Sequence, residues 1–341
     1  MNGWSEGKEH SKERLGWLDF GKACGILVVL AVHAGCSLGA LTFYGGMFYM
    51  PVFFVAAGYT FRRKEGEPYG RFLRKKAERL LIPYAAASAF LWLFFWAKDS
   101  LLAGNPGDVK PLSLFGILYS RNQMWAVGYA GENPVLMNVL NAPLWFLTAM
   151  FLVYAWYGLI SRSKWKWGLL GAGLACSIVW HYASPLLLPW SLEAVPYFAC
   201  FFAAGERLRG RGGVRALLDD PRLTAGCAAG FLLLGYLCGS VNLSCGDYGR
   251  SMLAYLFVGS AGSFLVFAAG AWLEKISPAA SRAVGLVGQE TLLILCLHMF
   301  LFMFLRTGAV LLGFGEGLTQ AVLVFGSLAA LTAAGRVRRR R

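Results

Sequence analysis

Apolar stretches of about 20 residues recur along the whole chain and are separated by short polar or basic segments. A helix needs about 20 apolar residues to cross a bilayer, whereas a strand of a membrane barrel needs only about ten alternating ones. The pattern therefore predicts an all-α fold, a polytopic integral membrane bundle of about ten transmembrane helices. The predicted spans are 22–41, 46–62, 80–97, 143–160, 167–182, 190–206, 222–240, 252–273, 289–306 and 318–335.

One connection between the predicted spans is long enough to have structure of its own. Residues 98–142 contain the breaker run Gly104-Asn105-Pro106-Gly107, followed by a partly apolar segment at 112–130. That segment is expected either to lie along the membrane surface or to re-enter the membrane. We expect residues 1–341 to form a single membrane domain, with 1–20 as an N-terminal segment and 336–341 as a basic tail.

The basic residues indicate how the bundle is oriented. Cytoplasmic loops of membrane proteins carry an excess of Lys and Arg. If the N-terminus is cytoplasmic, the 32 Lys and Arg residues all fall on the cytoplasmic side except Lys98, Lys110, Arg121, Arg250 and Arg306. The sequence therefore predicts a multi-pass plasma-membrane protein with both termini in the cytoplasm and its basic tail beside anionic lipid.

The formal net charge of +14 also raises the question of nucleic-acid binding. Only 15% of the residues are charged, against about a quarter in a soluble domain, and 57% are hydrophobic. The basic residues stand in short clusters between apolar runs, where they orient spans in a bilayer. The lipid bilayer, and not nucleic acid, is therefore the expected partner, and homo-oligomerisation is left open.

The eight cysteines show no metal-ligand spacing and no CxxC pair. Most of them lie inside apolar runs, where a small buried thiol is ordinary. No metal site is predicted. Cys238 and Cys245 flank one exterior loop and could form a disulfide.

Ionisable residues of the first span form the clearest candidate for chemistry. Asp19 and Lys22 are three positions apart and His33 follows Lys22 by eleven, almost three helical turns, so all three project from one face. An ionisable residue deep in a bilayer is a functional candidate, because it is costly to expose to lipid. The alternatives are a neutral His33 hydrogen-bonded within the bundle, and an Asp19–Lys22 ion pair that only closes the helix end.

Five segments of the chain are characteristic in combination. They are Arg14-x4-Asp19-x2-Lys22-x10-His33, Met50-Pro-Val-Phe-Phe-Val-Ala-Ala-Gly-Tyr59, Lys76-Ala-Glu-Arg79-Leu-Leu-Ile-Pro83-Tyr84, Leu144-Trp-Phe-Leu147 and Gly288-Gln-Glu-Thr-Leu-Leu-Ile-Leu-Cys-Leu-His298. In this order they resemble the membrane acyltransferase-3 family, particularly its fucose 4-O-acetylase-like branch of O-acetyltransferases. Ala57 and Tyr59 stand where that family usually has Ser and Phe, and the resemblance covers nearly the whole chain.

The resemblance implies an acyltransferase for groups other than aminoacyl groups. It would move an acetyl or short acyl group from acetyl-CoA or another acyl-CoA to a hydroxyl of a carbohydrate or other cell-envelope acceptor, as in polysaccharide modification. A hydroxyl needs a base to become a good nucleophile, and neutral His is the usual base near neutral pH. His33 is the expected base. Lys22 and Arg14 could bind donor phosphate or tune the entrance, and Asp19 is expected to offset the burial of Lys22.

Candidate binding residues follow from the same segments. Lys76 and Arg79 match the family's basic pair and are expected to bind donor phosphate, with Arg14, Arg62 and Arg63 as further candidates, because Arg matches phosphate geometry. Most of the charge in 62–79 is also explained by membrane orientation alone. Trp145, Tyr59 and His298 are candidates for binding the acceptor. Trp145 could equally be an interfacial Trp, and His298 could equally be satisfied in the core.

Two other classes of protein fit the same residues. A transporter or flippase of a polar or lipid-linked solute could use the ionisable stripe to line its path, without acyl transfer. The chain could also be the membrane half of a two-part system that resembles the membrane domain of certain membrane-bound racemases. Binding of acyl-CoA that depends on Lys76 and Arg79 would favour the enzyme.

Overall fold

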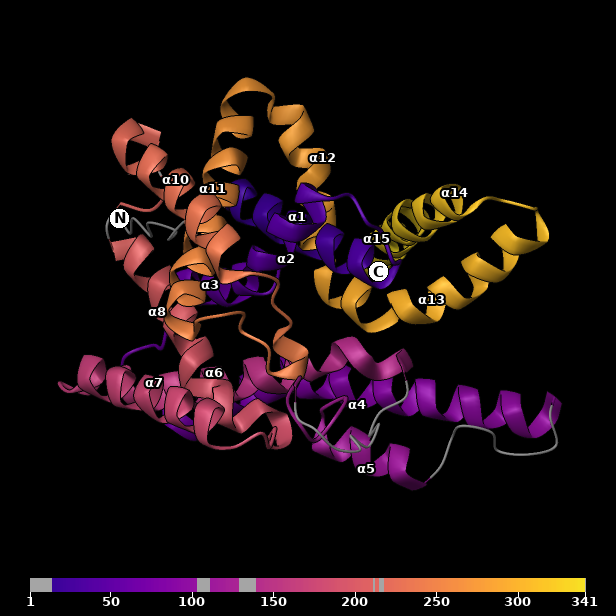
Figure 1. The fold of residues 1–341 in the computed structure, drawn as a ribbon, viewed down its shortest axis with the longest axis horizontal. Helices are drawn as coiled ribbons and strands as arrows, with labels where there is room; N and C mark the ends of the chain where they lie inside the picture. The colour runs from indigo at the N-terminus through magenta and orange to yellow at the C-terminus, as the bar shows by residue number, and fades with distance from the viewer. Residues whose placement is uncertain (1–13, 103–110, 129–138, 211, 215–217, 341) are drawn as a thin grey trace, which may run out of the picture.

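The computed structural model describes residues 14–102, 111–128, 139–210, 212–214 and 218–340. Helices make up most of these residues, which contain two isolated β-bridges and no extended strand (Figure 1). The α-helices are α1 Gly16–His33, α2 Ala40–Phe48, α3 Pro51–Tyr59, α4 Tyr69–Leu102, α5 Pro111–Tyr119, α6 Trp145–Ile160, α7 Lys166–Ala183, α8 Val195–Gly210, α10 Pro221–Cys238, α11 Met252–Ile276, α12 Pro278–Gln289, α13 Thr291–Leu311, α14 Glu316–Ala321 and α15 Ser327–Arg340. Shorter 3₁₀ turns are η1 Val139–Leu144, η2 Pro189–Ala194 and η3 Leu243–Cys245, and a π-helical turn, η4 Val322–Gly326, joins α14 to α15.

Eight helical segments in the described part of the chain are long and apolar enough to cross a membrane. They correspond to eight of the ten predicted spans, and the all-α polytopic bundle is confirmed. The other two predicted spans are present as α7 and α8. Helix α8 has 16 residues and ends in Glu206, Arg207 and Arg209, so its apolar part is short.

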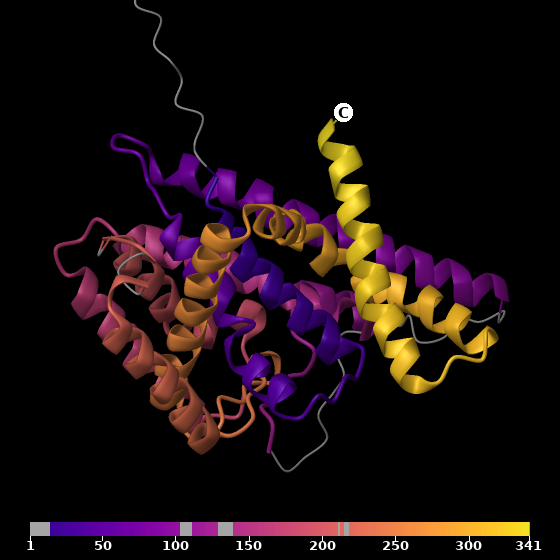
Figure 2. The same ribbon diagram turned by 90° about the horizontal axis from the view of Figure 1, so that it is seen from above.

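Helix α1 lies at the centre of the bundle and packs against α2, α3, α11, α12 and α13 (Figure 1). Helices α6, α7 and α8 gather on one side of it. The long helix α4 packs against α6 at one end and runs from there to the other side, where α13 and α15 lie (Figure 2). Most of the buried apolar residues form one large cluster that runs through most of these helices, and Leu91 and Phe95 form a second, small one. The candidate site residues of α1 are therefore surrounded by protein on several sides.

Helix α1 begins and ends earlier than predicted. It spans Gly16–His33, so the predicted limits of 22–41 were wrong, and His33 is the last residue of the helix. The reason lies in Gly35, which has φ +78°, while the N–H groups of Gly35 and Cys36 donate to Val32 O and Ala31 O. This is a glycine-terminated helix end of the Schellman type. This helix end places His33, the last helical residue, at the edge of a cavity.

The second predicted span is broken in the middle. Pro51 has no N–H to continue the helix from α2, so α3 starts anew at this residue. Helix α3 then lies against α8 with almost no space between the backbones. A Cβ added to Gly58 would lie 1.8 Å from Phe202 O, and one added to Gly205 would lie 2.0 Å from Val55 O. These two glycines fix the separation of α3 and α8.

The partly apolar segment predicted at 112–130 contains α5, which packs back along α4. The Tyr84 hydroxyl donates to Ile117 O, and Trp92 Nε1 donates to Ser113 Oγ at 3.2 Å. Residues 120–128 then lead from α5 toward α6, and residues 129–130 of the predicted segment lie outside the described residues.

Charged residues at the helix ends are paired across the bundle. Glu206 accepts from Lys166 and from the Tyr157 hydroxyl, which joins α6, α7 and α8. Glu290 accepts from Arg339 of α15.

The two cysteines that could form a disulfide are both free. Cys238 Sγ lies 3.6 Å from Tyr248 O, and Cys245 Sγ lies 3.5 Å from Ser244 Oγ. Each thiol is thus occupied by a different neighbour, and the predicted possibility of a Cys238–Cys245 bridge is not realised.

Candidate functional site

Two cavities lie one behind the other along α1, and they differ in chemistry. The first, which we call the lysine cavity, has a volume of about 360 Å³ and contains the side chains of Lys22, Lys76 and Arg79. Most of the rest of its wall is apolar, with Thr60, Gln289 and Thr291 as further polar residues. Lys76 Nζ lies 4.0 Å from the centre of the Tyr154 ring, so an aromatic face stabilises this cation inside the cavity.

The second, which we call the histidine cavity, has a volume of about 380 Å³ and is lined by His33 and Trp145. No Asp, Glu, Lys or Arg of the described residues contributes to its wall. The other polar residues of the wall are all uncharged: Thr42, Tyr49, Asn122, Ser240, Asn242 and Ser244. The side-chain oxygen Oδ1 of Asn122 is buried and has no hydrogen-bond partner in the described structure. The cavity therefore offers hydrogen-bonding groups and aromatic faces without a formal charge.

Among the residues that the structure describes, two belong to the walls of both cavities. They are Met50, between α2 and α3, and Leu295 of α13. Their relative exposures are 5% and 8%, so they are packed in the core of the bundle. On α1, Ile26 faces the lysine cavity and Val29, about one turn later, faces the histidine cavity. The two cavities are thus separated by a thin apolar septum.

His33 and His298 are directly hydrogen-bonded. His298 Nε2 lies 3.0 Å from His33 Nδ1, and His298 Nδ1 lies 2.8 Å from Ile294 O. A carbonyl oxygen only accepts, so His298 Nδ1 carries a proton and, in the neutral ring, Nε2 is the acceptor. His33 Nδ1 is then the donor in the pair, and His33 Nε2 is left unprotonated. His298 is fully buried, whereas His33 lines the histidine cavity.

Asp19 joins two cations at the start of α1. Its carboxylate lies 2.6 Å from Lys22 Nζ and 2.9 Å from Arg14 Nε. The predicted Asp19–Lys22 ion pair is therefore confirmed, and Arg14 belongs to the same cluster. Asp19 and Arg14 line a third, larger cavity between α1, α11 and α12. Helix α12 comes very close at this point, because a Cβ added to Gly288 would lie 1.8 Å from Asp19 O.

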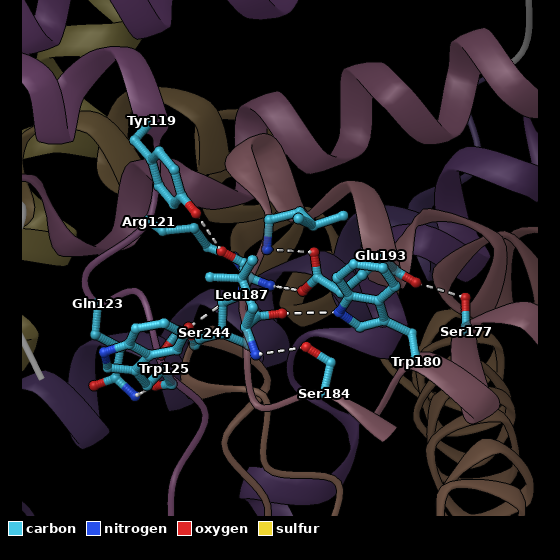
Figure 3. A network of polar contacts seen from close by, with 12 residues as sticks. Tyr119, Arg121, Gln123, Trp125, Ser177, Trp180, Ser184, Leu187, Glu193 and Ser244 are labelled. Carbon is cyan, nitrogen blue, oxygen red and sulfur yellow. Dashed lines mark hydrogen bonds and ion pairs between the residues drawn. The ribbon is translucent and has the colours of Figure 1, made fainter. Parts of the chain in front are cut away.

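A buried polar network contacts Ser244 and Trp145, which line the histidine cavity (Figure 3). Arg121 is fully buried and pairs with Glu193 of η2, and its Nη1 also donates to Ser244 O at 3.3 Å. Its guanidinium lies 5.9 Å from the Trp145 ring centre. Burial raises the pKa of the Glu193 carboxyl, although the neighbouring guanidinium acts in the opposite direction. The network ties the loops before α6, before α8 and before α11 together around Trp145.

The structure brings most of the predicted site residues to these cavities. His33 and Trp145 line the histidine cavity, His298 holds His33, and Lys22, Lys76 and Arg79 line the lysine cavity.

Three other predicted site residues, Arg62, Arg63 and Tyr59, line neither the lysine cavity nor the histidine cavity. Arg62 is exposed and lines neither cavity. Arg63 Nη1 donates to Gly158 O at 3.1 Å, and the Tyr59 ring packs edge-on against Trp17 at 4.8 Å. These contacts hold the ends of neighbouring helices together and do not reach the two cavities.

Several residues that line the site were not among the residues predicted from the sequence. Met50 and Leu295 are ordinary apolar residues of spans, and Asn122, Asn242 and Ser244 come from connections without a motif. Met50 directly precedes Pro51, and Leu295 precedes His298 by one turn. Both residues also lie within the segments that resemble the family, so their positions beside a proline and beside a predicted site residue are the sequence signals that could have identified them.

Together the bundle and its cavities define a multi-pass helical membrane protein with an internal site for polar chemistry. A family model described as an acyltransferase domain, acyltransferase-3, matches residues 15–335. The chain belongs to this family and is an acyltransferase. No curated protein and no solved structure gave a significant match.

Proposed function

We propose that this acyltransferase moves an acetyl or short acyl group from acyl-CoA to a hydroxyl of an uncharged carbohydrate of the cell envelope. One observation carries the proposal. The paired His33 and His298 stand at an uncharged polar cavity, and a basic cavity lies on the other side of a two-residue septum. A hydroxyl acceptor suits the first cavity, and a polyphosphate donor suits the second.

His33 is the base of the proposed reaction. Its Nε2 is unprotonated when Nδ1 donates to His298, and a hydroxyl placed in the histidine cavity can donate to this nitrogen. As the hydroxyl oxygen attacks the thioester carbonyl carbon, its proton passes to His33 Nε2. The carbon–sulfur bond then breaks, and the leaving CoA thiolate takes that proton. The products are an O-acyl ester and CoA thiol, and His33 returns to its neutral state.

His298 positions this base. By accepting from His33 Nδ1 it fixes the ring orientation and tautomer, and it stabilises the imidazolium that forms when Nε2 takes the proton. His298 is itself fixed by Ile294 O one turn earlier on α13. The arrangement resembles the base-and-orienter logic of catalytic triads, with a neutral imidazole in place of the carboxylate.

The lysine cavity is the proposed donor site. Lys22, Lys76 and Arg79 present cationic groups from α1 and α4 in one space, and phosphate groups favour such clusters. Asp19 holds Lys22 in position and partly offsets its charge, while Arg14 completes the cluster. In the proposed orientation, with both termini in the cytoplasm of a plasma-membrane protein, this cavity opens toward the cytoplasmic pool of acyl-CoA.

The histidine cavity supports an uncharged acceptor. Sugars bind through hydroxyl hydrogen bonds and through stacking on aromatic rings, and this wall has amides, hydroxyls, Tyr49 and Trp145. The nearby cation Arg121 is neutralised by Glu193 and is fully buried. A phosphate or carboxylate on the acceptor would therefore lose its hydration without gaining a partner.

The proposal is tested with purified protein in lipid nanodiscs, supplied with acetyl-CoA and a panel of neutral saccharides. Release of free thiol and formation of an ester, detected by mass spectrometry, are expected with wild-type protein. His33→Ala should abolish both. His181→Ala is the matched control, because His181 lies beside Tyr248 and lines neither cavity.

Full activity of folded His33→Ala protein would contradict the assignment of the base. Movement of a solute across vesicles without any acyl donor, with no thiol release under any condition, would favour the transporter or flippase instead.

A further inference from the structure

The septum between the two cavities has a consequence for the donor. Met50 and Leu295 form the shared wall, and Ile26 and Val29 of α1 lie beside them with relative exposures of 0% and 2%. All four side chains are apolar. Phosphate groups would be stripped of their hydration in such a passage without gaining partners. Only the uncharged end of a donor can enter it.

The septum lies close to the histidine pair, and this position indicates which part of the donor reaches the septum. Leu295 precedes His298 by one turn on α13, and Val29 precedes His33 by about one turn on α1. The septum therefore lies directly next to the base. When the thioester carbonyl meets a hydroxyl at His33 Nε2, the atoms bonded to that carbonyl, the acyl substituent among them, are held close to Met50 and Leu295.

We propose that Met50 and Leu295 select the acyl chain by its length. This inference rests on the proposed function, because it assumes that the donor enters from the lysine cavity. Both side chains are almost fully buried, so a longer acyl group has to displace them further than a short one does. Apolar pockets typically discriminate single methylenes by factors of about 10 to 200, so a two-residue septum is sufficient for strong selection.

The neighbouring wall offers a matched control. Leu292 lies on the same helix as Leu295, about one turn earlier, and it lines the lysine cavity alone. Leu292→Ala and Leu295→Ala remove the same atoms from the same helix. They differ in whether the residue belongs to the septum.

The experiment compares kcat/KM for butyryl-CoA with kcat/KM for acetyl-CoA, using one neutral saccharide acceptor. Leu295→Ala and Met50→Ala should each raise the butyryl-to-acetyl ratio by about tenfold or more. Leu292→Ala should leave the ratio within about twofold of wild type. Leu295→Phe should narrow the passage and lower acetyl transfer while saturable CoA binding is retained.

An unchanged ratio in both Leu295→Ala and Met50→Ala would overturn the inference, as would an equal rise in Leu292→Ala. If either alanine variant does not fold, Leu295→Val and Met50→Val take its place in the same comparison. The failure of the proposed function itself looks different, because wild-type protein would then transfer no acyl group from any acyl-CoA.

Discussion

His298 Nε2 lies 3.0 Å from Nδ1 of His33, although the two residues are 265 positions apart in the chain. One closes the first helix and the other lies in the first half of α13, so the contact exists only because α13 packs against α1. The buried ring of His298 is anchored to its own helix through Ile294 O. The pair therefore gives His33 a fixed orientation at the edge of the histidine cavity.

His298→Ala should lower kcat for acyl transfer by about 10- to 100-fold, because His33 loses the partner that fixes its tautomer. The KM for acyl-CoA should change little, since His298 does not line the lysine cavity. Steady-state kinetics give both values, and the pH profile of kcat should shift as well. A structural role alone would lower the amount of folded protein without moving that profile.

Lys76→Gln should raise the KM for acyl-CoA by about tenfold through the loss of one charge-assisted contact. Lys75→Gln is the matched control, because Lys75 is exposed and pairs with Glu67 at 2.6 Å outside the cavity. The acceptor KM should be unaffected in both. Equal effects of the two substitutions would mean that general surface charge, and not the lysine cavity, attracts the donor.

Asn122→Asp should weaken acceptor binding. It places a carboxylate in a cavity whose described wall has no formal charge, at an atom that is buried without a partner. We expect the acceptor KM to rise by about tenfold or more, with the KM for acyl-CoA unchanged. Asn122→Ser, which keeps a neutral hydrogen-bonding group, should have a smaller effect. Improved use of neutral saccharides by Asn122→Asp would contradict this account of the cavity.

Glu193→Ala should destabilise the protein by about 3–5 kcal/mol, because it leaves Arg121 buried without its carboxylate. Thermal unfolding in detergent, followed by size-exclusion chromatography, measures the change. The double substitution Arg121→Met with Glu193→Leu removes both charges and should recover part of the loss. No recovery would show that the ion pair itself, and not the avoidance of an unpaired charge, stabilises these loops.

Gly58→Ala should lower stability by about 1–3 kcal/mol or prevent folding, since the new Cβ would overlap Phe202 O and force α3 away from α8. Gly70→Ala is the control, because a Cβ at this helical position meets no atom within 4 Å. It should be neutral or stabilising by about 0.5–1 kcal/mol. Unfolding temperatures of the two variants provide the comparison.

Much of the fold could be predicted from the sequence, because lipid imposes a simple pattern of apolar length. Eight of the ten predicted spans meet the criteria for membrane helices, and the family resemblance is confirmed over residues 15–335. The limits of α1 were wrong, because a single glycine in a left-handed conformation ends the helix inside an apolar run. Hydrophobicity alone contains no information about such an ending.

The site could be predicted only in part. His33, Lys22, Lys76 and Arg79 carry ionisable groups within motifs, and such groups are conspicuous in an apolar sequence. The contact between His33 and His298, and the shared position of Met50 and Leu295, depend on how distant helices pack. Nothing local in the sequence determines such packing.

The central claim is that His33 joins a donor from the lysine cavity to an acceptor in the histidine cavity. The most direct test uses sealed proteoliposomes with a neutral saccharide acceptor trapped inside. Acetyl-CoA labelled in its acetyl group is added only outside. The account predicts labelled acetyl ester on the trapped acceptor and free CoA thiol outside, with no labelled acetyl-CoA inside the vesicles. The His33→Ala variant should form neither the ester nor the thiol. If the same wild-type protein acetylates the saccharide in detergent but never the trapped acceptor, transfer across the septum is contradicted.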